Sequence, residues 1–208
     1  MKKNYIASDS AVIAAVMAIS LLISGIFTAV SSEKHIEERL VRLHILANSD
    51  SELDQQLKLR VRDAVLASSD ELFEPYSSSE EAEEALSGQL DKIKAIADST
   101  LAENGCDDRT VCEITSMDID RREYGEYTVP AGRYTALRIT IGEGKGHNWW
   151  CVMYPPLCVP CAGVDMTDEE IMEKYGGELT DEDIELLTEE GYKPRLYIAE
   201  LIGGLLEK

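Results

Sequence analysis

Five cysteines give this sequence its widest choice of side-chain chemistry. Cys158 and Cys161 have the Cys-x-x-Cys spacing of redox motifs, in which a helix N-terminus stabilises the first thiolate. The stretch before them, Tyr154-Pro155-Pro156-Leu157, is not typical of a strand that leads into such a helix. In an oxidising compartment a structural disulfide is the more economical interpretation. We predict a Cys151–Cys158 bridge that closes the Pro155-Pro156 turn, with Cys158–Cys161 or free thiols as the alternatives.

The histidines raise a second kind of chemistry, nucleophilic catalysis. Cys151 could be paired with His147 or with His44 as a nucleophile with its base. No residue at a recognisable spacing is present to orient the base. A histidine packed on the face of a sheet is the simpler interpretation of either residue, so we predict no catalytic site.

Metal and phosphate sites are also poorly matched by the sequence. The pairs Cys106/Cys112 and Cys158/Cys161 lack the paired two-residue spacing of a zinc site. The acids between residues 165 and 190 do not alternate around a central glycine as in an EF-hand. In the loop 142–146, Gly146 stands where a P-loop needs a Ser or Thr to hold magnesium, which favours a glycine-rich turn in a β-hairpin. We therefore predict no metal and no cofactor.

Two adjacent tryptophans, Trp149 and Trp150, have the composition of an interface anchor. Neighbouring side chains of a strand point to opposite faces of the sheet. One indole should therefore fill the core, while the other is either covered by a helix or exposed for a partner.

Two helices and several strands must position these residues. Alternation over residues 41–45 predicts a strand, and Ser49 with Glu52 has the spacing of a capping box at the start of a helix. A second helix is predicted from Ser78 to Leu101, ended by Asn104-Gly105. Each predicted helix has an apolar stripe at helical spacing. The first stripe is Leu53, Leu57, Val61, Ala64 and Val65, and the second is Ala82, Leu86, Leu90, Ile93, Ala97 and Leu101.

The sequence after residue 110 changes to a β pattern. Residues 111–119 and 133–141 alternate as strands, and 149–154 is expected to be the returning strand of the hairpin. This order predicts an α+β fold in which a strand, two helices and an antiparallel sheet form a helix-on-sheet layer. We assign residues 32–162 to this domain.

Residues 163–208 form a separate acidic stretch that we expect to be mostly helical and packed on the same domain. Thr167/Glu170 and Thr180/Asp183 have the spacing of N-terminal boxes of two short helices. Acids in the first turn of a helix are favoured by its dipole.

The N-terminus carries the pattern of an export segment. Lys2 and Lys3 precede the uncharged stretch 11–30, which as a helix would be about 30 Å long, enough to cross a bilayer. The lysines in front and the acidic sequence behind place the rest of the chain outside the cytoplasm. Small residues at 29–31 leave cleavage open, so residues 1–31 are predicted to be a signal peptide or an N-terminal membrane anchor.

The overall charge excludes several classes of partner. The chain has 20 Lys and Arg against 40 Asp and Glu, a net charge of −20. A nucleic-acid binder needs a cationic footprint, and so does a protein that binds anionic lipid through a basic patch. Since 44% of the residues are hydrophobic, the chain is also not expected to be disordered.

Two blocks of sequence resemble the stage II sporulation protein R family. The first comprises residues 42–51, with Asp54-Gln55 and 57–65. The second comprises residues 130–139 and 142–158 and contains the Trp pair. The likeness extends from about residue 38 to the C-terminus and is loosest in the acidic stretch. Cys161, Cys106 and Cys112 lie outside both blocks.

The resemblance implies a signalling protein without catalytic residues. Members of this family are made in the forespore and exported into the space between forespore and mother cell. There they activate a membrane-embedded aspartic protease that removes the pro-sequence of sporulation sigma-E. We expect this peptidase as the partner, the membrane as a second contact through residues 11–30 if they are uncleaved, and no nucleic acid. Our candidate receptor contacts, taken from the two blocks, are Arg42, His44, Asn48, Asp50, Trp149 and Trp150.

Two other functions stay open. An exported thiol-dependent enzyme or redox protein would use Cys151 or Cys158. A membrane-tethered structural domain would have no effect on processing of the sigma factor.

Overall fold

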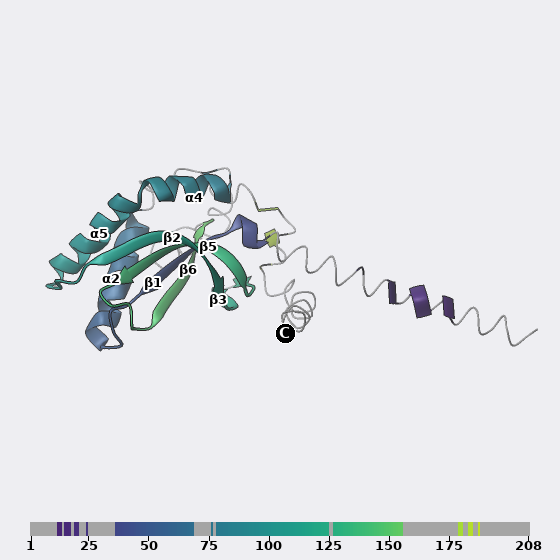
Figure 1. Ribbon diagram of the computed structural model, residues 1–208, viewed down its shortest axis with the longest axis horizontal. Helices are drawn as coiled ribbons and strands as arrows, with labels where there is room; N and C mark the ends of the chain where they lie inside the picture. Colours follow the sequence, from purple (N-terminus) through teal and green to yellow (C-terminus); the bar gives the residue numbers. More distant parts are fainter. Residues whose placement is uncertain are drawn as a thin grey trace, which may run out of the picture.

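Three helices cover one face of a four-stranded mixed sheet in the computed structural model (Figure 1). The structure describes residues 12–13, 15–17, 19–20, 24, 36–68, 76, 78–124, 127–155, 179–180, 183–184 and 187. The helices are α2 (Glu52–Ala67), α4 (Ser79–Gly88) and α5 (Leu90–Glu103). The strands are β1 (Val41–Leu46), β2 (Thr110–Ile119), β5 (Gly132–Ile141) and β6 (Asn148–Tyr154), with β3 (Arg122–Tyr124) and β4 (Tyr127–Val129) forming a separate two-stranded sheet.

The strand order in the main sheet is β2-β5-β1-β6. β5 is antiparallel to β2 and parallel to β1, while β6 is antiparallel to β1. The α+β class is confirmed, but the expectation of an antiparallel sheet is wrong. The physical reason is the long connection through three helices and β2, which lets the chain return beside β1 in the same direction.

The glycine-rich loop after β5 does not close a hairpin, because β1 lies between β5 and β6. The chain instead crosses the end of β1 on its way to β6. Gly142 and Gly144 have positive φ angles of 54° and 62°, which glycine adopts without steric cost. The predicted hairpin through this loop is therefore wrong, whereas the strand predicted over residues 149–154 is present as β6.

The helix boundaries follow local capping chemistry. Ser51, and not Ser49, caps α2 by accepting a hydrogen bond from the backbone N–H of Asp54. Leu53, which the sequence predicts in the apolar stripe, is exposed in the first turn of this helix. Ser78 caps α4 by accepting from Glu81, as its spacing predicts. The single predicted helix is broken at Gln89 into α4 and α5.

A large apolar core lies between the helices and the sheet, with a smaller one on the second face. In the large core, Leu43, Ile45 and Leu137 from the sheet meet Val61 of α2 and Ile93 of α5, all fully buried. Among the described residues, the smaller core covers one end of the second face. It consists of Ile36, Leu40, Ile119, Val129, Tyr134, Val152 and Leu187.

Part of the acidic stretch contributes to this smaller core. The predicted Thr180/Asp183 box is confirmed, since the Asp183 carboxylate accepts from the Thr180 backbone N–H at 2.8 Å. Asp183 also forms an ion pair with Arg39, and Leu187 is buried. The predicted Thr167/Glu170 box lies outside the described residues.

The N-terminal stretch is described only in pieces. Among the described residues, no helix has the length and apolar character needed to span a bilayer. Most of residues 11–30, where the sequence predicts such a span, lie outside the described residues. Those described include Val12, Ile13, Val16, Met17 and Ile19, whose side chains are more than half exposed.

Candidate functional site

The two sequence blocks meet at one end of the sheet. The loop between β1 and α2 runs alongside the loop between β5 and β6, and we name this contact the loop junction (residues 47–50 and 142–147). The backbone N–H of Gly146 donates to the carbonyl of Ala47 at 2.9 Å, and that of Lys145 donates to Asn48 at 3.0 Å. The two blocks, far apart in the sequence, therefore contact each other directly in the fold.

Asn48 and Gly142 lock the junction together. The Asn48 side-chain oxygen accepts a hydrogen bond from the backbone N–H of Glu143 at 2.9 Å. A Cβ atom at Gly142 would collide with the same side chain, so this position requires glycine for space as well as for its positive φ. Asn48, a predicted receptor contact, thus has a structural role here.

Asp50 and His147 form an exposed pair at the tip of the junction. One Asp50 carboxylate oxygen accepts from the His147 backbone N–H at 2.7 Å and lies 2.5 Å from the ring Nδ1. These hydrogen bonds hold the pKa of Asp50 below its usual value. Lys58 supports the loop from α2, because its ammonium group donates to the His147 carbonyl at 3.0 Å. The pair offers a partner an ordered, solvent-facing imidazole.

The two tryptophans divide between the faces of the sheet, as alternation predicts. Trp149 points to the helix face, where it packs partly buried against the large core. The Arg62 guanidinium carbon lies 4.3 Å from the centre of the Trp149 ring. Trp149 is therefore positioned as a packing residue, whereas Trp150 points to the second face.

A single row of side chains crosses the second face, one from each strand. Register pairs Glu113 of β2 with Arg138 of β5, Arg138 with His44 of β1, and His44 with Trp150 of β6. The His44 and Trp150 rings are stacked at 3.8 Å with an angle of 3° between their planes. We call Glu113, Arg138, His44 and Trp150 the cross-strand row.

His44 is the buried member of this row. It is only 3% exposed, and neither ring nitrogen has a hydrogen-bond partner of good geometry among the described residues. Burial lowers the pKa of His44 from 6.5 to about 4, and the charge of Arg138 acts in the same direction, with the Asn148 side chain partly opposing both. The ring is therefore neutral at physiological pH and serves as a flat support for the Trp150 indole.

Arg42 lies deeper, beneath the β3–β4 hairpin, and is fully buried. Its Nε donates to the Cys151 carbonyl at 3.0 Å and its Nη2 to the Tyr124 hydroxyl at 2.6 Å. The guanidinium also lies 5.1 Å from the Tyr134 ring centre, while Nη1 has no partner among the described residues. Burial lowers the pKa of Arg42. This predicted receptor contact instead ties the hairpin to the sheet.

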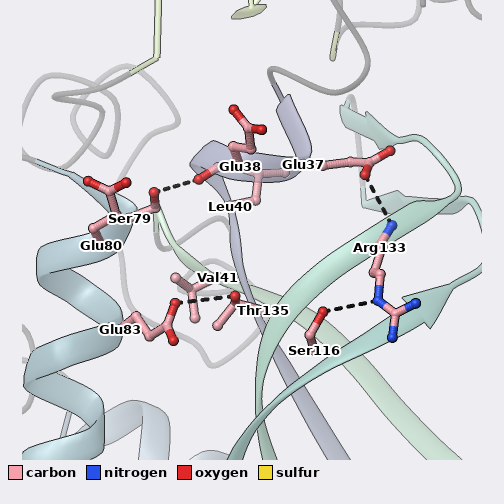
Figure 2. Close-up of a pocket in the computed structure, with 10 residues that line it drawn as sticks. All are labelled: Glu37, Glu38, Leu40, Val41, Ser79, Glu80, Glu83, Ser116, Arg133 and Thr135. Carbon is pink, nitrogen blue, oxygen red and sulfur yellow. Dashed lines mark hydrogen bonds between the residues drawn. The ribbon is translucent and has the colours of Figure 1, made fainter.

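A cavity of about 320 Å³ lies at the opposite end of the sheet, between α4 and the starts of β1 and β5 (Figure 2). The Glu37 carboxylate accepts from the Arg133 backbone N–H, and Ser79 donates to the Glu38 carbonyl. None of the predicted contact residues lines it. Within the described part of the chain, no group of three or more His, Cys, Asp or Glu side chains is arranged to hold a metal ion.

The cysteines fall into two groups. Cys151 is disulfide-bonded, while Cys106 and Cys112 are free thiols. Burial raises the pKa of Cys112 to about 11, which disfavours a reactive thiolate there. Cys158 and Cys161 lie outside the described residues, so the Cys151–Cys158 pairing stays a prediction.

Sequence reasoning missed Arg138 and Glu113. Both stand in correctly predicted strands, and alternation places them on the face opposite the apolar residues. Only the register across the sheet shows that they share a row with His44 and Trp150.

Comparison with known proteins agrees with the resemblance of the two blocks. The family model of stage II sporulation protein R (spore_II_R) matches residues 37–163. A stage II sporulation protein R from Bacillus subtilis (strain 168) is 39% identical over 150 residues, which is 67% of this chain and 67% of that relative. No solved structure matches the chain.

Proposed function

Because the chain belongs to the stage II sporulation protein R family and thus has a role in sporulation, we propose that it acts as an intercellular signal. In this proposal the forespore exports the protein into the space between the two membranes. There it activates, by contact, the membrane-embedded aspartic protease that processes pro-sigma-E in the mother cell. The protein itself performs no catalysis.

The observation that carries the proposal is the convergence of both matched blocks on one region. The first block supplies His44, Asn48 and Asp50, and the second supplies His147 and Trp150. Their strands are neighbours, and the loop junction fixes the loops to each other. Such a preorganised surface loses little conformational entropy when it binds a partner.

The N-terminal residues support the proposed location. Two lysines precede an uncharged apolar stretch, and the large side chains described within it are more than half exposed. Exposed apolar side chains in such a run are stabilised by transfer into lipid. We infer that this stretch directs the domain across the forespore membrane.

Activation by contact sets a requirement on binding energy. To convert a receptor from 1:99 to 99:1 in favour of its active form, the signal must bind that form about 10⁴-fold more tightly, about 5.5 kcal/mol. A buried aromatic hot spot contributes about 2 kcal/mol or more. At the lower end of this range, several such contacts must distinguish the two receptor states.

Replacement of Trp150 by Ala tests the proposal. We expect loss of pro-sigma-E processing with normal protein level and export, since Trp150 is partly exposed on the second face, where it stacks on His44, whereas Trp149 packs against the large core. Leu53→Ala is the matched control, because Leu53 is a 63% exposed apolar residue of α2, a helix that packs on the face of the sheet opposite the cross-strand row. Processing is followed by immunoblot of the sigma factor during sporulation. Unchanged processing in the Trp150→Ala strain would contradict the role of this residue.

A thiol-dependent enzyme makes a different prediction. Replacement of all five cysteines by Ser would abolish a thiol enzyme and leave a contact signal active if the protein still folds. The disulfide at Cys151 and the raised pKa of Cys112 favour the signal. Thermal unfolding of the purified variant provides the control for folding.

A further inference from the structure

We propose that the half of the second sheet face that no described element covers docks an acidic, extended segment of the partner protein. We call this surface the open face and define it as two rows of side chains. They are the cross-strand row and the next row toward the loop junction, Val111, Thr140, Leu46 and Asn148. The identity of the partner rests on the proposed function, but the chemistry of the surface does not.

Arg138 at the centre of the open face has spare hydrogen-bonding capacity. A guanidinium has five N–H donors. Within the described residues its charged neighbour is Glu113, whose carboxylate lies 3.6 Å from Nη1, too far for a good hydrogen bond. Its Nε is shielded from solvent and has no partner there. A carboxylate from outside could form an end-on bidentate pair with the two Nη groups, which Glu113 does not form.

The charge of the second face differs from that of the chain. Arg42, Arg122 and Arg138 lie on it or under its hairpin, and each has a guanidinium nitrogen without a partner among the described residues. The acids described with them are Glu113 in β2, Glu123 in the hairpin and Asp183 beside the smaller core, of which Glu123 and Asp183 are paired with Arg121 and Arg39, while the whole chain carries a net charge of −20. An acidic ligand is therefore attracted to this face in particular.

The apolar part of the open face sets the second requirement on the ligand. The Trp150 indole lies on the rigid His44 ring, partly exposed, and Leu46 lies beside it in the next row. Val111 at the far edge is 59% exposed. Strands lie about 4.8 Å apart, so the rows are about 14 Å wide, the length of about four extended residues. The fitting ligand alternates carboxylate and apolar side chains.

Two synthetic peptides test this chemistry on the full-length protein in detergent micelles. One alternates Glu and Leu, and the other has Lys in place of each Glu. We expect the Glu peptide to shift the NMR signals of the Arg138 Nε–H and the Trp150 indole N–H, and the Lys peptide to leave them unchanged. Equal shifts with both peptides, or with neither, would overturn the proposal.

Variants of Arg138 and Glu113, the two charged residues of the cross-strand row, show where the Glu peptide binds. Arg138→Gln should weaken binding of the Glu peptide about tenfold or more, since a charge-assisted bidentate pair is lost. The matched control is Arg133→Gln, because Arg133 lies on the same strand but faces the other side of the sheet, beside Ser116. Glu113→Gln removes the competing carboxylate and should tighten binding. It keeps the test decisive if Arg138→Gln fails to fold.

Sporulating cells separate the two proposals. Arg138→Glu should block sigma-factor processing, and Arg133→Glu should not. If deletion of the gene leaves processing intact while the purified protein still binds the Glu peptide through Arg138, the proposed function fails and the open face stands. If deletion blocks processing but Arg138→Glu does not, the function stands and the open face is wrong.

Discussion

The two faces of the main sheet are built from the same four strands for different purposes. On the helix face, Leu43, Ile45, Leu137 and Ile139 are fully buried under three helices. On the second face, the residues that alternate with them along the strands include Arg42, His44 and Arg138, and among the described residues the hairpin and the smaller core cover one end. A strand can thus devote alternate residues to stability and to recognition, because successive side chains point to opposite sides.

The difference also appears in the polar groups. On the second face, buried nitrogens of Arg42, His44, Arg122 and Arg138 lack partners among the described residues, whereas on the helix face Trp149 Nε1 is in the same situation. Each such group costs stability of about 1–3 kcal/mol unless something binds it. Buried polar groups without hydrogen-bond partners are found most often at functional sites. We interpret the second face as optimised for a ligand and the helix face as optimised for packing.

The largest expected effect is on the helix face of β1. Leu43→Ala should lower the free energy of unfolding by about 2–5 kcal/mol, because it removes a fully buried side chain and leaves a cavity. Leu46→Ala is the matched change on the second face of the same strand, where the side chain is only partly buried, and should cost less. Urea unfolding of both variants measures the difference. Equal losses would show that the two faces contribute alike to stability.

Acid should affect the second face through His44. Its pKa is about 4 in the folded protein and 6.5 unfolded, so between these values the unfolded chain binds the proton more readily. Stability is therefore complete above pH 6.5 and is lost as the pH falls toward 4, by up to about 3 kcal/mol.

His44→Phe keeps the flat support for Trp150 and removes the titrating group. The free energy of unfolding of this variant should decline less between pH 6.5 and 4 than that of the natural protein. Urea titrations at a series of pH values provide the comparison, and parallel pH profiles would argue against the buried, neutral imidazole.

The smallest effect is expected at the loop junction, where both faces end. Asp50→Ala removes the acceptor of the His147 N–H in a fully solvated pair. Global stability should change little, because exposed ion pairs contribute little. Hydrogen exchange at the His147 amide should become faster, while the Gly146 amide, bonded to Ala47, should remain protected. Faster exchange at both positions would mean that Asp50 holds the entire junction.

Much of the fold was predictable because local patterns report local structure. Alternation located β1, β2, β5 and β6, and Ser78 and Thr180 were correctly placed as capping residues. Ser49 was misplaced as a cap, since Ser51 two residues later has the same chemistry and the favourable geometry. Nothing in the pattern indicated the β3–β4 hairpin that covers one end of the second face.

The candidate site was predictable only in part. Trp150 and Asp50 stay predicted contacts from the two blocks, while Arg42 and Asn48 have structural roles within the fold. Arg138 escaped because its neighbours across the sheet belong to strands far away in the sequence. A charged residue on an exposed strand face has no distinguishing local pattern.

The sequence by itself determined the family, the four long strands, the first helix and the division of each strand into an apolar and a polar side, since all of these depend on residue type and short-range spacing. The tertiary structure alone decided which strands are neighbours. Placement of β1 between β5 and β6 joins the two blocks at the loop junction and aligns Glu113, Arg138, His44 and Trp150 in one row. Strand order and register are set by how the whole core packs, and no segment of the chain contains that information alone.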